Sequence, residues 1–111
     1  MTITTLNSPG LIAIYTERAR QISVEGYTRE HDAEHGPVVL INAALAYTVQ
    51  AQDIISEAEG HGVGADGPDT YWPWDPAGFK DTDDEIASLT KAGALIAAAL
   101  DVALDRKAGR V

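Results

Sequence analysis

The stretch from Pro37 to Gln52 contains no charged residue, and this feature limits the folds open to the chain more than any other. We expect a long helix from Val38 to Glu59 that is apolar on nearly every side, and such a helix must be surrounded by other protein. Two further helices of this length cover only part of it, so a second copy of the chain is the simplest cover and we expect a homo-oligomer, a dimer. The alternative is that a loop of the same chain folds over the open side.

Two shorter helical segments are expected before this stretch. Ser8-Pro9-Gly10 has the residues typical of a helix start, and it predicts a first helix with its body at Leu11–Glu25 that ends near Gly26. Thr28 then predicts the start of a short helical turn that ends at Gly36.

The last helix is predicted to begin at a capping box formed by Thr82 and Glu85 and to run to about Lys107. Residues 60–81 lie between the last two long helices and hold both tryptophans, five of the ten glycines and three of the five prolines. This composition predicts a long aromatic loop. Connections of this length inside compact domains tend to be functional, disordered or covering segments.

These elements define the expected fold class, which is all-α. We expect three main helices plus a short helical turn in a helical-bundle-like arrangement, with the aromatic loop between the last two main helices. The 111 residues suit a single domain over residues 1–111, with residues 1–9 flexible. Because cysteine is absent, any metal ion would have to be held by His, Asp, Glu or backbone oxygen.

The net charge of −9 opposes direct binding to nucleic acid, because affinity for a phosphate backbone comes from Lys and Arg. A small anionic molecule of mononucleotide size is still compatible with the sequence, since one or two well-placed cations and an aromatic platform suffice for it. The N-terminus resembles no secretion signal, and no stretch is an uninterrupted apolar membrane span, so we expect a cytoplasmic protein without membrane contact.

Two charged residues, Arg18 and Glu25, fall within the apolar stripe of the first helix. A charge in such a position needs a partner, because an unpaired buried charge is costly. One interpretation is an internal network of Arg18 and Glu25 with Asp32 or a backbone carbonyl. The other is a polar pocket in which Arg18 meets an anionic ligand, with Gln21 at its edge.

The aromatic loop contains a second group of candidate residues. Trp72 and Trp74 flank Pro73, and in an extended segment they would face opposite ways, so that one anchors the loop and the other lines a groove. The alternative is that both form a hydrophobic latch. Lys80 and Lys91 are candidate positive partners for the acidic segment 30–34.

His31, Asp32 and His35 form a weak metal-site candidate. Two histidines four residues apart share one helix face, a spacing similar to that of zinc-binding helices, although a third ligand would be needed. The alternative is a solvated or hydrogen-bonding histidine pair. Carboxylates at helical spacing, which could help hold Mg²⁺, are more typical of solvated faces: Asp53 with Glu57, and Asp101 with Asp105.

Three blocks of the chain resemble a family of small helical proteins encoded by phages and prophages: residues 17–35, with Glu-Arg-x-Arg-Gln-Ile-x-x-Glu-Gly-Tyr-Thr-x-Glu-His-Asp-x-x-His; residues 72–75, with Trp-Pro-Trp-Asp; and residues 91–96, with Lys-Ala-Gly-Ala-Leu-Ile. The resemblance covers roughly residues 17–106. It implies that the matched polar positions form one cluster, namely Arg18, Gln21, Glu25, His31, Asp32 and His35.

The resemblance also implies a hypothesis for function: a small helical binding protein that sequesters a host molecule, such as a nucleotide signal used in antiviral defence. The candidate ligand-binding residues are Arg18, Gln21, Glu25, His31, Trp72, Trp74 and Lys80. One alternative is a hydrolase of nucleotides or phosphate esters that uses a divalent metal, Zn²⁺ or Mg²⁺, held by His31, Asp32 and His35. Another alternative is an acidic inhibitor that binds a host protein.

Overall fold

The computed structural model describes residues 7–110, and between these residues it contains helices and no strand. The elements are α1 (Pro9–Ser23), α2 (Arg29–His35), α3 (Pro37–Ala58), the short 3-10 turns η2 (Pro68–Thr70) and η3 (Pro76–Gly78), and α4 (Glu85–Lys107). The predicted all-α class is therefore confirmed. The first six residues of the segment expected to be flexible lie outside the described residues, and Pro9 already belongs to α1.

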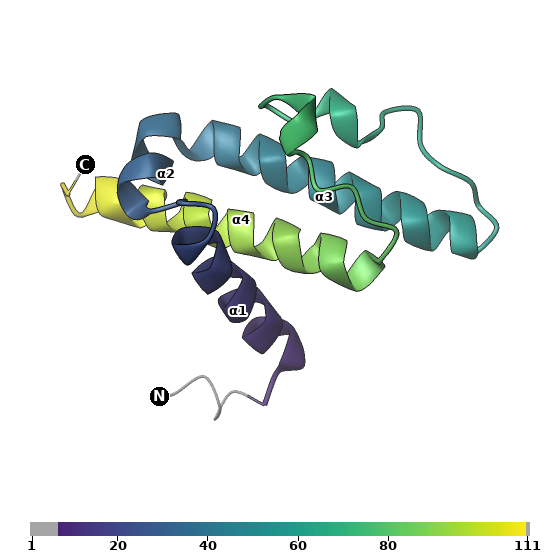
Figure 1. The fold of residues 1–111 in the computed structure, drawn as a ribbon, viewed down its shortest axis with the longest axis horizontal. Helices are drawn as coiled ribbons and strands as arrows, with labels where there is room; N and C mark the ends of the chain where they lie inside the picture. Colours follow the sequence, from purple (N-terminus) through teal and green to yellow (C-terminus); the bar gives the residue numbers. More distant parts are fainter. Residues whose placement is uncertain (1–6, 111) are drawn as a thin grey trace.

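Helices α3 and α4 run antiparallel, side by side, and form the centre of the molecule (Figure 1). Their contact is built largely from alanine, and small side chains let two helices approach closely. The buried cluster consists of Leu40, Ala43, Ala44, Tyr47, Ala92, Leu95, Ala98, Ala99 and Val102. Near one end, the buried Ser88 hydroxyl donates a hydrogen bond of 2.9 Å to the side-chain oxygen of Gln50.

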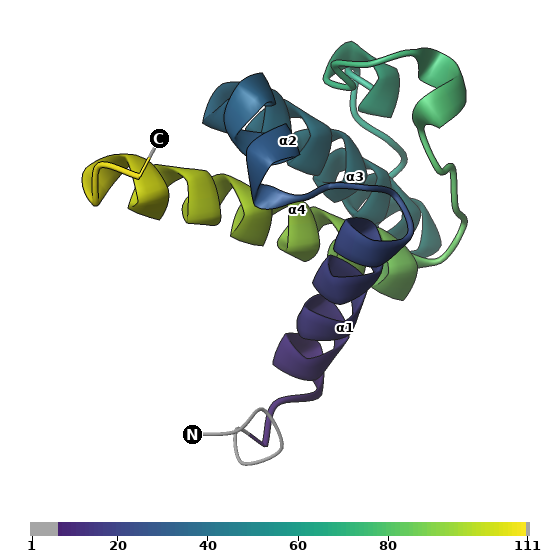
Figure 2. The same cartoon turned by 60° about the vertical axis from the view of Figure 1, so that its left-hand side comes forward.

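Helix α1 crosses α4, and the N-terminal end of α1 extends away from the body of the molecule (Figures 1 and 2). Its start is as predicted, because the Ser8 hydroxyl accepts a hydrogen bond from the Leu11 N–H and Pro9 opens the helix. The crossing depends on Gly93, since a Cβ added there would lie 2.5 Å from Cδ1 of Ile14. Absence of a side chain at Gly93 therefore lets α1 pack directly on α4.

The start of α4 differs from the predicted capping box of Thr82 and Glu85. Asp84 is the N-cap, and its carboxylate accepts the Ile86 N–H at 2.9 Å. Thr82 instead accepts the N–H of Asp84. An aspartate cap adds a negative charge at the positive end of the helix dipole, and this favours Asp84 over a capping box that starts two residues earlier.

The 68–80 segment covers one side of α3 (Figure 1). The rings of Tyr47 and Phe79 stack with their centroids 4.6 Å apart, and the Lys80 N–H donates to the Tyr47 hydroxyl at 2.9 Å. The alternative considered from the sequence, a loop of the same chain that folds over the apolar helix, is therefore present on this side. It leaves the other side of α3 open, where Val38, Ile41 and Leu45 remain exposed.

By length and composition, α3 and α4 would each be able to cross a membrane, with a mean hydropathy of 1.4 and 1.5 in their most apolar windows. In this fold 39% of each window is buried against the rest of the chain. The core helices of soluble proteins have the same properties, so the cytoplasmic location stays a prediction.

Candidate functional site

Arg18 and Asp32 form a buried ion pair that joins α1 to α2. The Arg18 guanidinium, in a residue only 8% exposed, donates to the Asp32 carboxylate at 2.7 Å, and Asp32 is fully buried. Arg18 also donates to the backbone carbonyl of Tyr27 at 3.1 Å and lies 3.5 Å from the Asp101 carboxylate on α4. This arrangement matches the internal network considered from the sequence, except that Glu25 is not part of it.

Glu25 belongs to a second network at the other side of α1. Arg20 forms two hydrogen bonds of 2.8 Å with the Glu17 carboxylate and one of 3.0 Å with Glu25. Lys91 of α4 reaches Glu17 at 3.3 Å, so its expected pairing with the acidic segment 30–34 is wrong. The hydrogen bonds from Arg20 lower the pKa of the Glu17 carboxyl below its ordinary value, and the charge of Lys91 acts in the same direction against the effect of burial.

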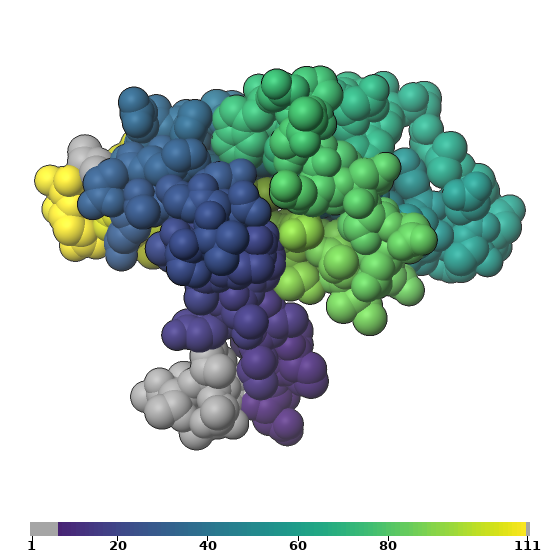
Figure 3. Space-filling model, in the orientation of Figure 1, coloured from purple at the N-terminus to yellow at the C-terminus, as the bar shows by residue number. Residues whose placement is uncertain are grey.

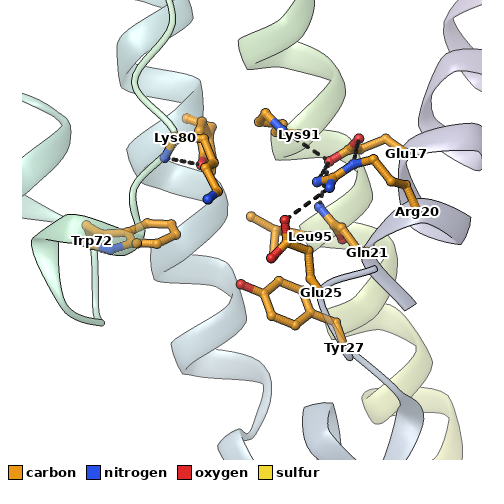
Figure 4. A pocket seen from close by; sticks show the side chains of 11 residues that line it. Glu17, Arg20, Gln21, Glu25, Tyr27, Trp72, Lys80, Lys91 and Leu95 are labelled. Atoms are coloured by element: carbon orange, nitrogen blue, oxygen red, sulfur yellow. Dashed lines mark hydrogen bonds and ion pairs between the residues drawn. The ribbon is translucent and has the colours of Figure 1, made fainter. Parts of the chain in front are cut away.

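This second network forms one wall of a narrow cavity of about 20 Å³ (Figure 4). The polar lining residues are Glu17, Arg20, Gln21, Glu25, Lys80 and Lys91, and the aromatic ones are Tyr27, Tyr47 and Trp72. They come from α1, the 24–28 connection, α3, the 68–80 segment and α4. In Figure 3 the surface of α1 and α2 meets the surface of the 68–80 segment along a narrow seam over the two central helices.

The charged lining of the cavity has one cation more than it has anions. Arg20 pairs with both Glu17 and Glu25, and Lys91 pairs with Glu17, so these two cations balance the two carboxylates. Within residues 7–110, the Lys80 ammonium has no carboxylate at ion-pair distance. In a chain with a net charge of −9, the lining of this cavity therefore carries a local surplus of positive charge.

Gln21 lines the cavity and carries an unpartnered hydrogen-bond acceptor. Its residue is 3% exposed, and its Nε2 donates to the Glu17 carboxylate at 3.4 Å. This long contact favours the observed orientation of the amide, because a flipped amide would set its oxygen against the carboxylate. The remaining Oε1 atom is buried without a hydrogen-bond partner among the described residues. A buried acceptor in this state costs free energy, which a donor N–H from a ligand would recover.

Trp72 lines the cavity, and Trp74 is not among its lining residues. The two indole rings pack edge to face with centroids 5.2 Å apart, so the expectation that they face opposite ways is wrong. The segment is not extended here, because η2 and η3 turn the chain on both sides of the pair. Trp74 packs against Tyr27 and His35, and the Trp72 ring N–H donates to the Asp75 carbonyl at 2.9 Å.

The histidine pair lies next to the buried ion pair. His31 Nδ1 is 3.0 Å from Asp32 Oδ1, and the His31 and His35 rings have centroids 4.4 Å apart. The other Asp32 oxygen holds Arg18, so a metal would have to compete with a buried guanidinium for this carboxylate. Residues 7–110 contain no group of three His, Asp or Glu side chains placed to hold a metal ion. The metal site stays a prediction that needs a further ligand.

Four of the predicted ligand-binding residues line the cavity: Gln21, Glu25, Trp72 and Lys80. Arg18, His31 and Trp74 lie outside its lining, and the charge of Arg18 is already neutralised. Sequence reasoning gave no ligand role to Glu17, Arg20, Tyr27, Tyr47 or Lys91. The sequence does contain two patterns that point to three of these residues. Glu17 and Arg20 stand one helical turn apart, which favours an ion pair, and Lys91 is the one charged residue within residues 86–100.

No protein-family model, curated protein or solved structure matches this chain. The resemblance to phage-encoded proteins therefore stays a prediction.

Tyr47 gives the site a measurable response to alkaline pH. Burial raises the pKa of its phenol from 10.0 to about 12. The folded state then holds the proton more tightly than the unfolded chain, so this stabilisation is complete below pH 10 and is lost as the pH rises through 12.

We expect the free energy of unfolding of the unaltered protein to fall between these two pH values by about 2 kcal/mol more than that of a Tyr47→Phe variant. Urea unfolding of both proteins across this range measures the difference. Parallel pH profiles would show that the phenol titrates as it does in water.

Proposed function

We propose that the protein binds a small anionic molecule of at most mononucleotide size in the cavity between α1 and the 68–80 segment, and withholds it from other proteins. The observation that carries this proposal is the Gln21 side chain, a buried and unpartnered acceptor at the wall of a cavity with a surplus cation. Binding sites of this kind combine apolar walls with a few polar groups that set the orientation of the ligand.

The cavity offers three kinds of contact to such a molecule. Lys80 and Lys91 suit a phosphate or carboxylate group, as charge-assisted donors. Tyr27 and Trp72 present aromatic surface to an unsaturated ring, and Gln21 Oε1 suits an N–H on the edge of that ring. A mononucleotide carries all three groups.

The size of the cavity means that a ligand can enter only if the site opens. Its volume of about 20 Å³ is room for roughly one water molecule and lies far below the roughly 300–1,000 Å³ usual for ligand pockets. Binding of a mononucleotide therefore requires the 68–80 segment to move outward. A nucleic-acid strand does not fit such a cavity, and the net charge of −9 opposes its approach.

Sequestration in the host cytoplasm is the role that the phage resemblance implies for such a binding protein. A buried ligand is shielded from other proteins as long as it stays bound. Binding of the small molecule to the purified protein can be measured without a cell.

Removal of the unpaired cation tests the proposal directly. We expect a Lys80→Ala variant to bind mononucleotides about 10- to 100-fold more weakly, because a hydrogen bond to a charged group contributes about 1.5–3 kcal/mol. Isothermal titration calorimetry with the four common ribonucleoside monophosphates, and with inorganic phosphate alone, measures the change. Lys107→Ala is the matched control, since it removes an exposed ammonium at the far end of α4. The proposal fails if the unaltered protein binds none of these probes and native mass spectrometry of the purified protein shows no retained small molecule.

A second variant separates binding from stability. Gln21→Met keeps the volume of the side chain and removes the unpartnered oxygen, so we expect the melting temperature to stay the same or to rise. Mononucleotide affinity should nevertheless fall about tenfold, because the ligand N–H loses its acceptor. A variant that loses stability and keeps its affinity would show that Gln21 has only a structural role.

A further inference from the structure

Helix α4 has an exposed apolar face that the chain itself does not cover. Leu89, Ile96 and Leu100 are 49%, 48% and 55% exposed, although they belong to the central helix pair. Each stands one position after a buried residue of α4, and one residue advances a helix by about 100°. The face therefore lies beside the α3 contact.

Helix α3 adds exposed residues on the same side of the pair. Ile41 and Leu45 also follow buried core residues by one position. Because the two helices are antiparallel, the same rotation turns both stripes to one side of the molecule. A shallow groove that brings Leu89 together with Gln52 and Ile55 of α3 supports this placement.

Opposite charges mark the two ends of this face. Glu85 and Lys107 are both exposed, and each lies eleven residues from Ile96. Eleven residues complete about three helical turns, so both charges point to the same side as Ile96. Between them the face carries no charge, since Lys91 and Asp101 lie on other sides of α4 and contact α1.

From this pattern we infer that two copies of the chain associate through α4, with the two α4 helices antiparallel about a two-fold axis at Ile96. The axis packs Ile96 against Ile96 of the second copy. It also sets each Glu85 opposite the Lys107 of the other chain, so both ends of the contact are complementary in charge. A parallel arrangement would set like charges against each other at both ends.

The exposed area fits this occupant. Full burial of a Leu or Ile side chain contributes about 1.5–3 kcal/mol, which at about 25 cal/mol per Å² corresponds to roughly 60–120 Å² of apolar surface. A half-exposed Leu or Ile therefore leaves on the order of 50 Å² in water. The exposed apolar residues of α3 and α4 are Val38, Ile41, Leu45, Ile86, Leu89, Ile96, Leu100 and Leu104. Together they expose on the order of 400 Å², which lies within the roughly 300–600 Å² of the largest apolar patches on typical monomers and is about half of the roughly 800 Å² that each partner buries in a stable interface.

An uncharged face also suits association of a chain with a net charge of −9, because two copies repel each other wherever acidic surfaces meet. The inference is independent of the ligand cavity, which uses Lys91 and Leu95 on another side of α4. Loss of dimerisation and loss of ligand binding are therefore distinguishable.

The first experiment measures the oligomeric state by native mass spectrometry and analytical ultracentrifugation. We expect the unaltered protein to be a dimer and an Ile96→Glu variant to dissociate at least 100-fold more readily. Val24→Glu is the matched control: Val24 is also exposed, at the end of α1, and this variant should remain a dimer. Circular dichroism checks that both variants keep their helices. An unaltered protein that is monomeric at all concentrations would overturn the inference, and a monomer that sediments with lipid vesicles would assign the face to a membrane instead.

The second experiment tests the antiparallel orientation by charge reversal. Glu85→Lys and Lys107→Glu should each weaken the dimer about tenfold, because each creates two like-charge pairs across the axis. The double variant Glu85→Lys/Lys107→Glu should recover most of the original affinity, since it restores opposite charges at both ends. A double variant that dissociates as readily as the weaker single variant would overturn the antiparallel arrangement.

Discussion

An Asp32→Ala variant is expected to lose about 3–5 kcal/mol of its free energy of unfolding, which is a large share of the stability of a small domain. The variant leaves the Arg18 guanidinium buried without its closest partner, the carboxylate at 2.7 Å. The carbonyl of Tyr27 and the more distant Asp101 offset only part of this loss. Urea unfolding followed by circular dichroism measures the change.

Two further variants identify the cause of this loss. Asp101→Ala should cost less than about 1 kcal/mol, because Asp101 is partly exposed and solvent screens its contact with Arg18. A double variant Arg18→Met/Asp32→Leu should be more stable than Asp32→Ala alone, since it removes the unpaired charge together with its former partner. If Asp101→Ala and Asp32→Ala lower the free energy of unfolding by the same amount, the ion pair of Arg18 with Asp32 is not the buried link between α1 and α2.

Local sequence signals predicted the helices well because they act over a few residues. Ser8 and Thr28 cap α1 and α2 through contacts with N–H groups three residues ahead, and such contacts can be inferred from sequence spacing alone. Gly36 has a φ angle of 86°, which favours glycine, and it ends α2 where predicted. The start of α4 was placed at Thr82 rather than Asp84, because several residues there have side chains suited to capping.

The candidate site was predicted only in part, because its contacts join distant segments of the chain. The interaction of Arg18 with Asp32 was one of two interpretations, and both residues come from neighbouring helices. The contact between Glu17 and Lys91 joins α1 to α4 across 74 residues, and no local pattern specifies it. The packing of Trp72 on Trp74 depends on the two 3-10 turns η2 and η3. The glycine and proline content of the segment predicts a loop, but it does not predict where these turns lie.

Tyr47 connects the stability of the fold with the shape of the cavity. Its ring stacks on Phe79, packs against the edge of Trp72 at 5.6 Å between centroids, and its hydroxyl accepts the Lys80 N–H. These three contacts attach the 68–80 segment to α3. The segment carries the Trp72 and Lys80 walls of the cavity, so their position depends on a residue of the core.

A Tyr47→Ala variant should therefore lose stability and ligand binding together. Removal of a buried aromatic ring typically costs about 3–5 kcal/mol, whereas Tyr47→Phe, which loses only the hydroxyl contact, should cost about 1 kcal/mol at neutral pH. Urea unfolding measures the stability, and titration with mononucleotides at a low temperature, where both variants are folded, measures the binding. Tyr47→Phe should keep most of its affinity, because the stacked rings still hold the segment. A folded Tyr47→Ala protein that binds mononucleotides as well as Tyr47→Phe does would show that the 68–80 segment is positioned without this ring, and that the cavity does not depend on the core of the fold.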